Sequence, residues 1–307
     1  MAEHLNDEQS QLLQEAQQAL DQKNWPQAVA SLEELYQSVS TLAINYRLVT
    51  ALFFDEQYQL AADFLDDYLS DYVTEPTYFK LALEILLKNQ HFVEAQELLN
   101  LAHPSEYEDY LQTIRQAEKE AAEQMAVTFE TVARQFYHLS DYDLAKQEER
   151  YLAARNLPVD TFVQGAKYLL IDPFTSPVMR VTLMEDLHKL AWSQTISYRW
   201  LDDETYENNF AQSPMPIESS AYQGLDKIYQ DQVAHQDPLA WQYLQDQNRL
   251  EISLLYPRQD ELLTDLPRWA KRNQDRYYQR PVVKSKDAQD QLQDLVWQKI
   301  NAFLPGI

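Results

Sequence analysis

Residues 55–68 read DEQYQLAADFLDDY, and the same spacing of side chains recurs at three other places in the chain. Each copy has a polar turn, then an aromatic residue, then an alanine three positions later. The four pairs are Trp25 with Ala28, Tyr58 with Ala61, Phe92 with Ala95, and Tyr142 with Ala145. The alanines are 33, 34 and 50 residues apart. This spacing indicates an internal repeat of about 34 residues.

Apolar residues around each alanine follow helical spacing. Positions four and seven after it are apolar in nearly every copy, so they share one face of a helix with the aromatic residue and the alanine. The position nine before the alanine, ahead of the polar turn, is also apolar in every copy. The small alanine allows two helices to approach closely. Pro26 falls in the first turn of a second helix, and we expect Pro76, Pro104 and Pro158 to follow second helices. The pattern predicts antiparallel helix pairs, which must stack to cover their apolar faces.

These features resemble the tetratricopeptide-repeat family, whose unit is a helix–turn–helix of 34 residues. The resemblance covers roughly residues 8–158. It implies an α-α superhelical solenoid, of the kind found in bacterial tetratricopeptide-like proteins. Three residues depart from the family pattern: Val49 and Leu83 stand where small residues are usual, and Glu149 stands at an apolar position. An irregular helical bundle is the alternative architecture.

We therefore expect a mainly α-helical chain with two domains. The repeat domain, 1–193, has units near 8–40, 41–75, 76–104 and 105–158 and a degenerate end unit at 159–193. The gap between the third and fourth alanines contains 16 residues more than one repeat, which predicts a long or additional helix. The second domain, 194–307, is mostly helical, with helices expected at 220–234, 239–255, about 266–278 and 288–303. Asp237-Pro238 opens the second of these helices, and Ser176-Pro177 is an N-cap followed by a first-turn proline at the start of a helix in the end unit. Alternating large and polar side chains predict a short β-hairpin near 195–210.

Composition excludes several classes of site. The 307 residues include 3 glycines and no cysteine, so the chain has no phosphate-binding glycine loop, disulfide framework or thiolate metal site. The net charge of −24 would repel nucleic acid phosphates and can attract basic partners. No apolar run approaches the ~20 residues that span a bilayer, and the acidic start differs from a secretory signal. We expect a cytoplasmic protein without membrane contact.

The sequence contains no complete set of residues that matches a known catalytic motif. Glu185 and His188 form one E-x-x-H pair, but a di-iron site needs a second such pair and further carboxylates. Asp141 and Asp143 begin like a calcium loop that lacks its glycine and distant glutamate. No G-x-S-x-G elbow is present. We expect no enzyme activity, no cofactor and no metal.

The family resemblance implies a partner-binding groove lined by first helices of the repeats. Matching the repeat positions places these residues there: Leu13, Gln17, Tyr46, Thr50, Phe53, Lys80, Glu84, Glu130, Arg134 and Tyr137. Only Lys80 fits the carboxylate clamp with which some members capture chaperone tails. A polar and aromatic groove instead suits an extended or helical peptide, and its acidic rim favours a basic one. Alternatively, several of these side chains only pack between neighbouring repeats.

A basic segment, 268–286, is the second candidate surface. It carries seven cationic residues against the single acid Asp275, a net of +6. Five of the seven form the candidate anion-binding set: Arg268, Lys271, Arg272, Arg276 and Arg280. This segment gives the alternative function, a regulator that contacts RNA, DNA or another anionic partner. A solvated helix face, or internal pairing with the acidic repeats, is the explanation that we favour for this segment. Our principal hypothesis is a non-catalytic scaffold or adaptor that binds a protein or peptide. The sequence carries no signal for an oligomeric state.

Overall fold

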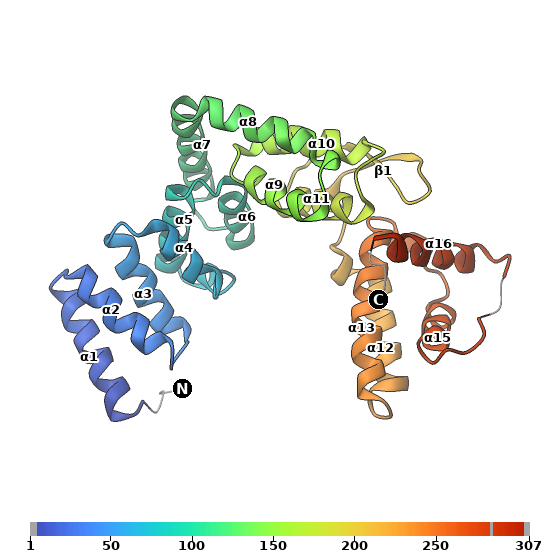
Figure 1. The fold of residues 1–307 in the computed structure, drawn as a ribbon, viewed down its shortest axis with the longest axis horizontal. Coiled ribbons are helices and arrows are strands. Elements are labelled where there is room, and N and C mark those ends of the chain that lie inside the picture. Colours follow the sequence, from blue (N-terminus) through green and yellow to red (C-terminus); the bar gives the residue numbers. More distant parts are fainter. Residues whose placement is uncertain (1–4, 283–284, 304–307) are drawn as a thin grey trace. The chain divides into compact units, whose positions relative to one another are not determined.

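The computed structural model describes residues 5–282 and 285–303, and within these ranges the chain is mostly helical (Figure 1). The only strands among the described residues form one two-stranded antiparallel sheet. The prediction of a mainly α-helical chain with a small β-hairpin is therefore confirmed. Residue contacts divide the chain into two compact units. Unit 1 is Met1–Phe136 with Glu148–Phe162, and unit 2 is Tyr137–Gln147 with Val163–Ile307.

In unit 1, each of the first six helices packs against the helix that follows it. These helices are α1 (Asp7–Asp21), α2 (Trp25–Tyr36), α3 (Leu42–Phe54), α4 (Tyr58–Asp66), α5 (Pro76–Lys88) and α6 (Phe92–Ala102). The three predicted anchors Ala28, Ala61 and Ala95 lie at the starts of α2, α4 and α6, and each has no exposed surface. A larger side chain would separate the helices there. Pro76 corrects one expectation, because it opens α5 instead of ending a helix.

The turns inside the three pairs have the same backbone geometry. Lys23, Glu56 and Gln90 each precede their anchor alanine by five positions, and each has a positive φ, of 56°, 61° and 63°. In each pair, the first helix ends two residues before the positive-φ residue. The amide that follows the positive-φ residue donates to the carbonyl five positions earlier, as in Asn24 N to Ala19 O at 2.8 Å. The positive-φ residue occupies the left-handed position that ends the helix, where glycine is the usual residue. This turn geometry recurs at spacings of 33 and 34 residues.

The fourth copy differs from the first three. The extra sequence forms an additional helix, α7 (Tyr107–Gln124), as predicted, and α8 (Ala126–Tyr137) and α9 (Leu144–Ala154) follow it. Ala145 is exposed and Leu152 is 56% exposed, so the expectation that both pack inside a helix pair was wrong. Glu149 interrupts the apolar face of α9, and the buried residue of that helix is Ala154.

Unit 2 begins with the short 3₁₀ turn Leu139–Asp141 and contains the end of α10 (Val159–Ile171) and all of α11 (Pro177–Lys189). Ser176 caps α11 as predicted, since its hydroxyl accepts from the Met179 amide at 3.1 Å. The hairpin joins β1 (Ile196–Arg199) to β2 (Thr205–Asn208), with Ile196 opposite Asn208. It is anchored on the helices by Tyr198, which is 1% exposed and packs against the ring of Phe210 at 5.6 Å.

Helices complete unit 2. They are α12 (Ser220–Tyr229), α13 (Pro238–Leu255), the short α14 (Gln259–Leu262), α15 (Leu266–Tyr277) and α16 (Ala288–Phe303), with a π-helical turn at Gln230–Ala234. The sequence predicted all of these except α14. Helix α13 packs against α11, α12, α15 and α16, so it is the central element of this unit. Among the described residues, no helix is both long and apolar enough to cross a membrane.

Candidate functional site

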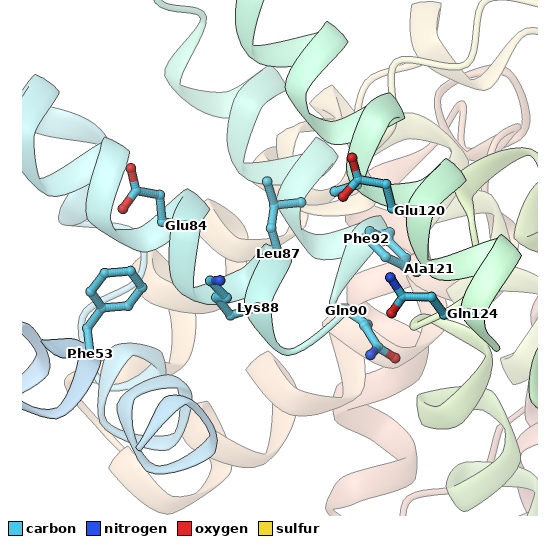
Figure 2. Close-up of a pocket in the computed structure, with 10 residues that line it drawn as sticks. Phe53, Glu84, Leu87, Lys88, Gln90, Phe92, Glu120, Ala121 and Gln124 are labelled. Carbon is cyan, nitrogen blue, oxygen red and sulfur yellow. The ribbon is translucent and has the colours of Figure 1, made fainter. Parts of the chain in front are cut away.

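Two of the predicted groove residues, Phe53 of α3 and Glu84 of α5, line the same hollow in unit 1. The hollow has a volume of about 400 Å³, within the usual range for ligand pockets. Figure 2 shows Phe53, Glu84 and Lys88 on one side of it and Glu120, Ala121 and Gln124 of α7 on the other. The remaining lining residues are Leu87, Gln90, Phe92 and Ala117. Helix α7, which has no counterpart in the repeat, therefore forms one wall.

The hollow has an apolar floor and a mixed charged rim. Phe92 is 1% exposed and belongs to the core, whereas Phe53 and Leu87 are half-buried and reach the solvent. At the rim, Glu84 lies 3.9 Å from Lys80, a contact too exposed to hold either side chain firmly. Glu120 accepts from Gln116 at 2.6 Å. The arrangement can accept an apolar side chain whose flanks are polar or basic.

Tyr46 and Thr50 are not free groove residues. The ring of Tyr46 stacks on Tyr78 with centroids 3.9 Å apart and also lies 6.2 Å from Tyr72. The Thr50 hydroxyl donates to the Tyr46 carbonyl of its own helix at 2.6 Å. Tyr46 of α3 thus packs against Tyr78 of α5, as the alternative to a groove position describes, whereas the hydrogen bond of Thr50 stays within α3.

The other predicted groove residues are spread over several helices. Leu13 is half-buried on α1, and Gln17 is exposed there and donates to Asp21 at 2.9 Å. Glu130 and Arg134 are exposed on α8. Tyr137 belongs to unit 2, where its ring lies 5.4 Å from that of Tyr168. None of these four α1 and α8 residues lines the hollow at Phe53.

The basic segment is largely neutralised by aspartates of its own unit. On α15, Arg268 pairs with Asp290 at 2.7 Å, and Arg272 contacts Asp290 at 3.0 Å and Asp294 at 2.7 Å. Arg276 also reaches Asp294 at 2.7 Å. Both aspartates are on α16, so the arginines hold α16 against α15.

The two other members of the anion-binding set share one carboxylate. Lys271 pairs with Asp275 at 2.7 Å, and Arg280 lies 3.7 Å from the same side chain. Lys271 keeps 74% of its side chain exposed and Arg280 keeps 61%. Lys284 lies outside the described residues. The sequence suggested pairing with the acidic repeats, but the ion pairs that the structure describes for this segment run to Asp275, to Asp287 and to the aspartates of α16.

Two of the titratable residues singled out in the sequence, His188 and Asp143, have ordinary structural partners. The His188 ring is 3.0 Å from the carbonyl oxygen of Phe210, next to the hairpin. Asp143 accepts from the Lys146 amide at 3.0 Å, which is the geometry of a helix cap. Across the described ranges, no group of three or more His, Asp or Glu side chains is placed to hold a metal ion.

One buried carboxylate was missed in the sequence. Glu251 of α13 is fully buried and accepts from Trp269 at 2.6 Å, Asn273 at 2.7 Å and Gln247 at 3.0 Å. Burial raises the pKa of Glu251, against the opposing effect of these donors and of Arg276. Little in the local sequence distinguishes this glutamate from its exposed neighbours, because two of its three donors, Trp269 and Asn273, lie on a helix about twenty residues away. Its hydrogen bonds with Trp269 and Asn273 tie α13 to α15.

Comparisons of the chain with protein-family models, with curated proteins and with solved structures found no match. The tetratricopeptide resemblance therefore rests on the residues and backbone turns described above.

Proposed function

We propose that unit 1 is a tetratricopeptide-like solenoid segment that recognises a protein or peptide without catalysis, as a cytoplasmic scaffold or adaptor. The hollow at Phe53, Leu87 and Glu84 is the observation that carries this proposal. It combines exposed apolar surface with a polar rim, which is the composition of peptide-binding grooves.

The equivalent turns at Lys23, Glu56 and Gln90 support the solenoid part of the proposal. Repeated turns give each helix pair the same shape, so stacking can continue from one pair to the next. In this proposal, an apolar side chain of the partner enters the hollow, and Glu84 and Glu120 favour basic residues beside it. The alternative, an anionic partner on α15, has less support because Arg268, Arg272 and Arg276 already have carboxylate partners.

Site-directed photocrosslinking tests the proposal. A photoreactive amino acid replaces Glu84 at the rim, and a second protein carries it at Gln59, an exposed α4 position that does not line the hollow. We expect a discrete crosslinked partner from position 84 and none from position 59. The added substitution Leu87→Glu, which places a charge in the apolar floor, should remove that product. The same product from both positions, or one that survives Leu87→Glu in a folded protein, would refute the proposal.

A further inference from the structure

A second hollow, within unit 2, lies between α11 and α13. It has a volume of about 290 Å³, which is at the small end of the range for ligand pockets. Its lining consists of Val178, Val181, Thr182 and Glu185 from α11 and Asp246, Arg249, Leu250, Ser253 and Leu254 from α13. The two helices pack directly on one another. The volume suits one long side chain better than a cofactor.

The floor of this hollow is apolar. Val181 is 8% exposed and Leu254 is 3% exposed, so both are anchored in the core and turn one edge toward the hollow. Val178 remains 43% exposed, and Leu250 is half-buried. Covering these edges would remove apolar surface from water, which favours binding of a hydrocarbon stem.

The Glu185 carboxylate gives the hollow its electrostatic character. Glu185 is half-buried, and no hydrogen bond or ion pair joins its carboxylate to another residue in the described part of the chain. Burial raises the pKa of Glu185, while Lys189 and His188 on the same helix act in the opposite direction. A carboxylate that loses water without gaining a partner is destabilised. An incoming cation would reverse that effect.

The charged residues around the hollow favour an occupant with a positive charge. Asp246 and Arg249 of α13 are both exposed, so two carboxylates and one guanidinium surround the hollow. An anion would meet Glu185 and Asp246. A purely apolar group would remove more water from Glu185 without giving it a partner. A cation on a hydrocarbon stem satisfies both the apolar floor and the carboxylate, as Lys and Arg side chains do at apolar surfaces.

We propose that the hollow between α11 and α13 binds an arginine or lysine side chain presented by a basic segment of another protein. The stem lies over Val181 and Leu254, and the charged head meets Glu185. This site is separate from the hollow of unit 1 and does not depend on the function proposed there. The net charge of −24 brings basic partners to the surface from a distance.

Methyl NMR of the full chain tests this proposal, because four valine and leucine residues line the hollow. The probe is a nine-residue capped peptide with a central Leu-Arg-Leu sequence between alanines. The matched control peptide contains citrulline, which keeps the shape of arginine without its charge. Protein variants are Glu185→Gln, Ser253→Leu to fill the hollow, and Asp231→Asn as a control for loss of one exposed charge elsewhere in unit 2.

We expect saturable shifts of the Val178, Val181, Leu250 and Leu254 methyl signals with the arginine peptide. Loss of a charge-assisted hydrogen bond should weaken binding about tenfold or more in Glu185→Gln and with the citrulline peptide. Ser253→Leu should abolish the shifts, and Asp231→Asn should change affinity less than about twofold. Absence of saturable shifts in the wild type overturns the proposal. So does equal affinity of the two peptides, or of wild type and Glu185→Gln. Dispersed methyl spectra show that each variant is folded.

Discussion

The polar network around Asn45 gives the sharpest test of the packing in unit 1. Asn45 and Tyr72 have no exposed surface. The Asn45 amide donates to the Phe64 carbonyl at 2.7 Å and to the Tyr36 hydroxyl at 3.2 Å, and its oxygen accepts from the Tyr72 hydroxyl at 2.8 Å. Phe64 lies in the last turn of α4, where carbonyls lack donors within the helix. The Asn45 side chain of α3 therefore satisfies a backbone carbonyl at the C-terminal end of α4.

Replacing Asn45 with alanine leaves two buried groups without partners, the Phe64 carbonyl and the Tyr72 hydroxyl. Each unsatisfied group costs about 1–3 kcal/mol, so we expect Asn45→Ala to lower the free energy of unfolding of unit 1 by about 3 kcal/mol. Tyr72→Phe leaves only the Asn45 side-chain oxygen without its donor and should lower the free energy of unfolding by about 1.5 kcal/mol. The double variant should cost about 1 kcal/mol less than the sum of the two, because the residues share one hydrogen bond.

Fluorine NMR of 5-fluorotryptophan-labelled protein measures this effect in unit 1 alone. Trp25 is the single tryptophan of unit 1, and the five others are in unit 2. Urea titration of the Trp25 signal gives the free energy of unfolding. Tyr58→Phe, a matched change on a tyrosine outside this network, should have an effect within about 0.5 kcal/mol. Additive single effects, or an Asn45→Ala cost below about 1 kcal/mol, would refute the argument.

Two further predictions concern unit 2. Because burial raises the folded-state pKa of Glu251, the stability that its protonation contributes is complete below the unfolded pKa and is lost as pH rises through the folded pKa. Urea titrations at several pH values give the free energies of unfolding of wild type and of Glu251→Gln. The wild-type value minus the variant value should fall as the pH rises. A difference that stays constant or rises with pH contradicts this. Arg272→Met should destabilise unit 2 by about 2 kcal/mol, since it removes a nearly buried partner of Asp290 and Asp294. Lys271→Met, at the neighbouring and exposed position of the same helix, should cost less than about 0.5 kcal/mol in the same titration. Equal effects of the two variants would show that the α15–α16 ion pairs add nothing.

Much of the secondary structure was predictable because its signals are local. Ser176 before Pro177, and Asp237 before Pro238, marked helix starts that the structure confirms, with Asp237 accepting from the Ala240 amide at 3.0 Å. The alternation of side chains in 195–201 located the hairpin. The short α14 was missed because four residues are too few to show helical periodicity.

The candidate sites were less predictable because they depend on which helices meet. Phe53 and Glu84 were selected from the repeat pattern, yet the wall opposite them comes from α7, which the repeat does not contain. The sequence showed a basic segment at 268–286. It did not show that aspartates of α16 would lie 2.7 Å from its arginines. Such contacts join residues about twenty positions apart, on helices whose relative rotation is set by packing.

By itself, the sequence determined that this chain forms helices, where the first three pairs turn, and that Ala28, Ala61 and Ala95 are buried. It could do so because periodicity and small-residue spacing act over a few helical turns. Tertiary structure alone decided which polar groups lost water and which of these gained partners. Asn45 and Glu251 are buried with hydrogen bonds, and Glu185 is half-buried with an unpaired carboxylate beside a hollow. Solvation depends on every neighbour in space, and most of those neighbours are distant in the chain.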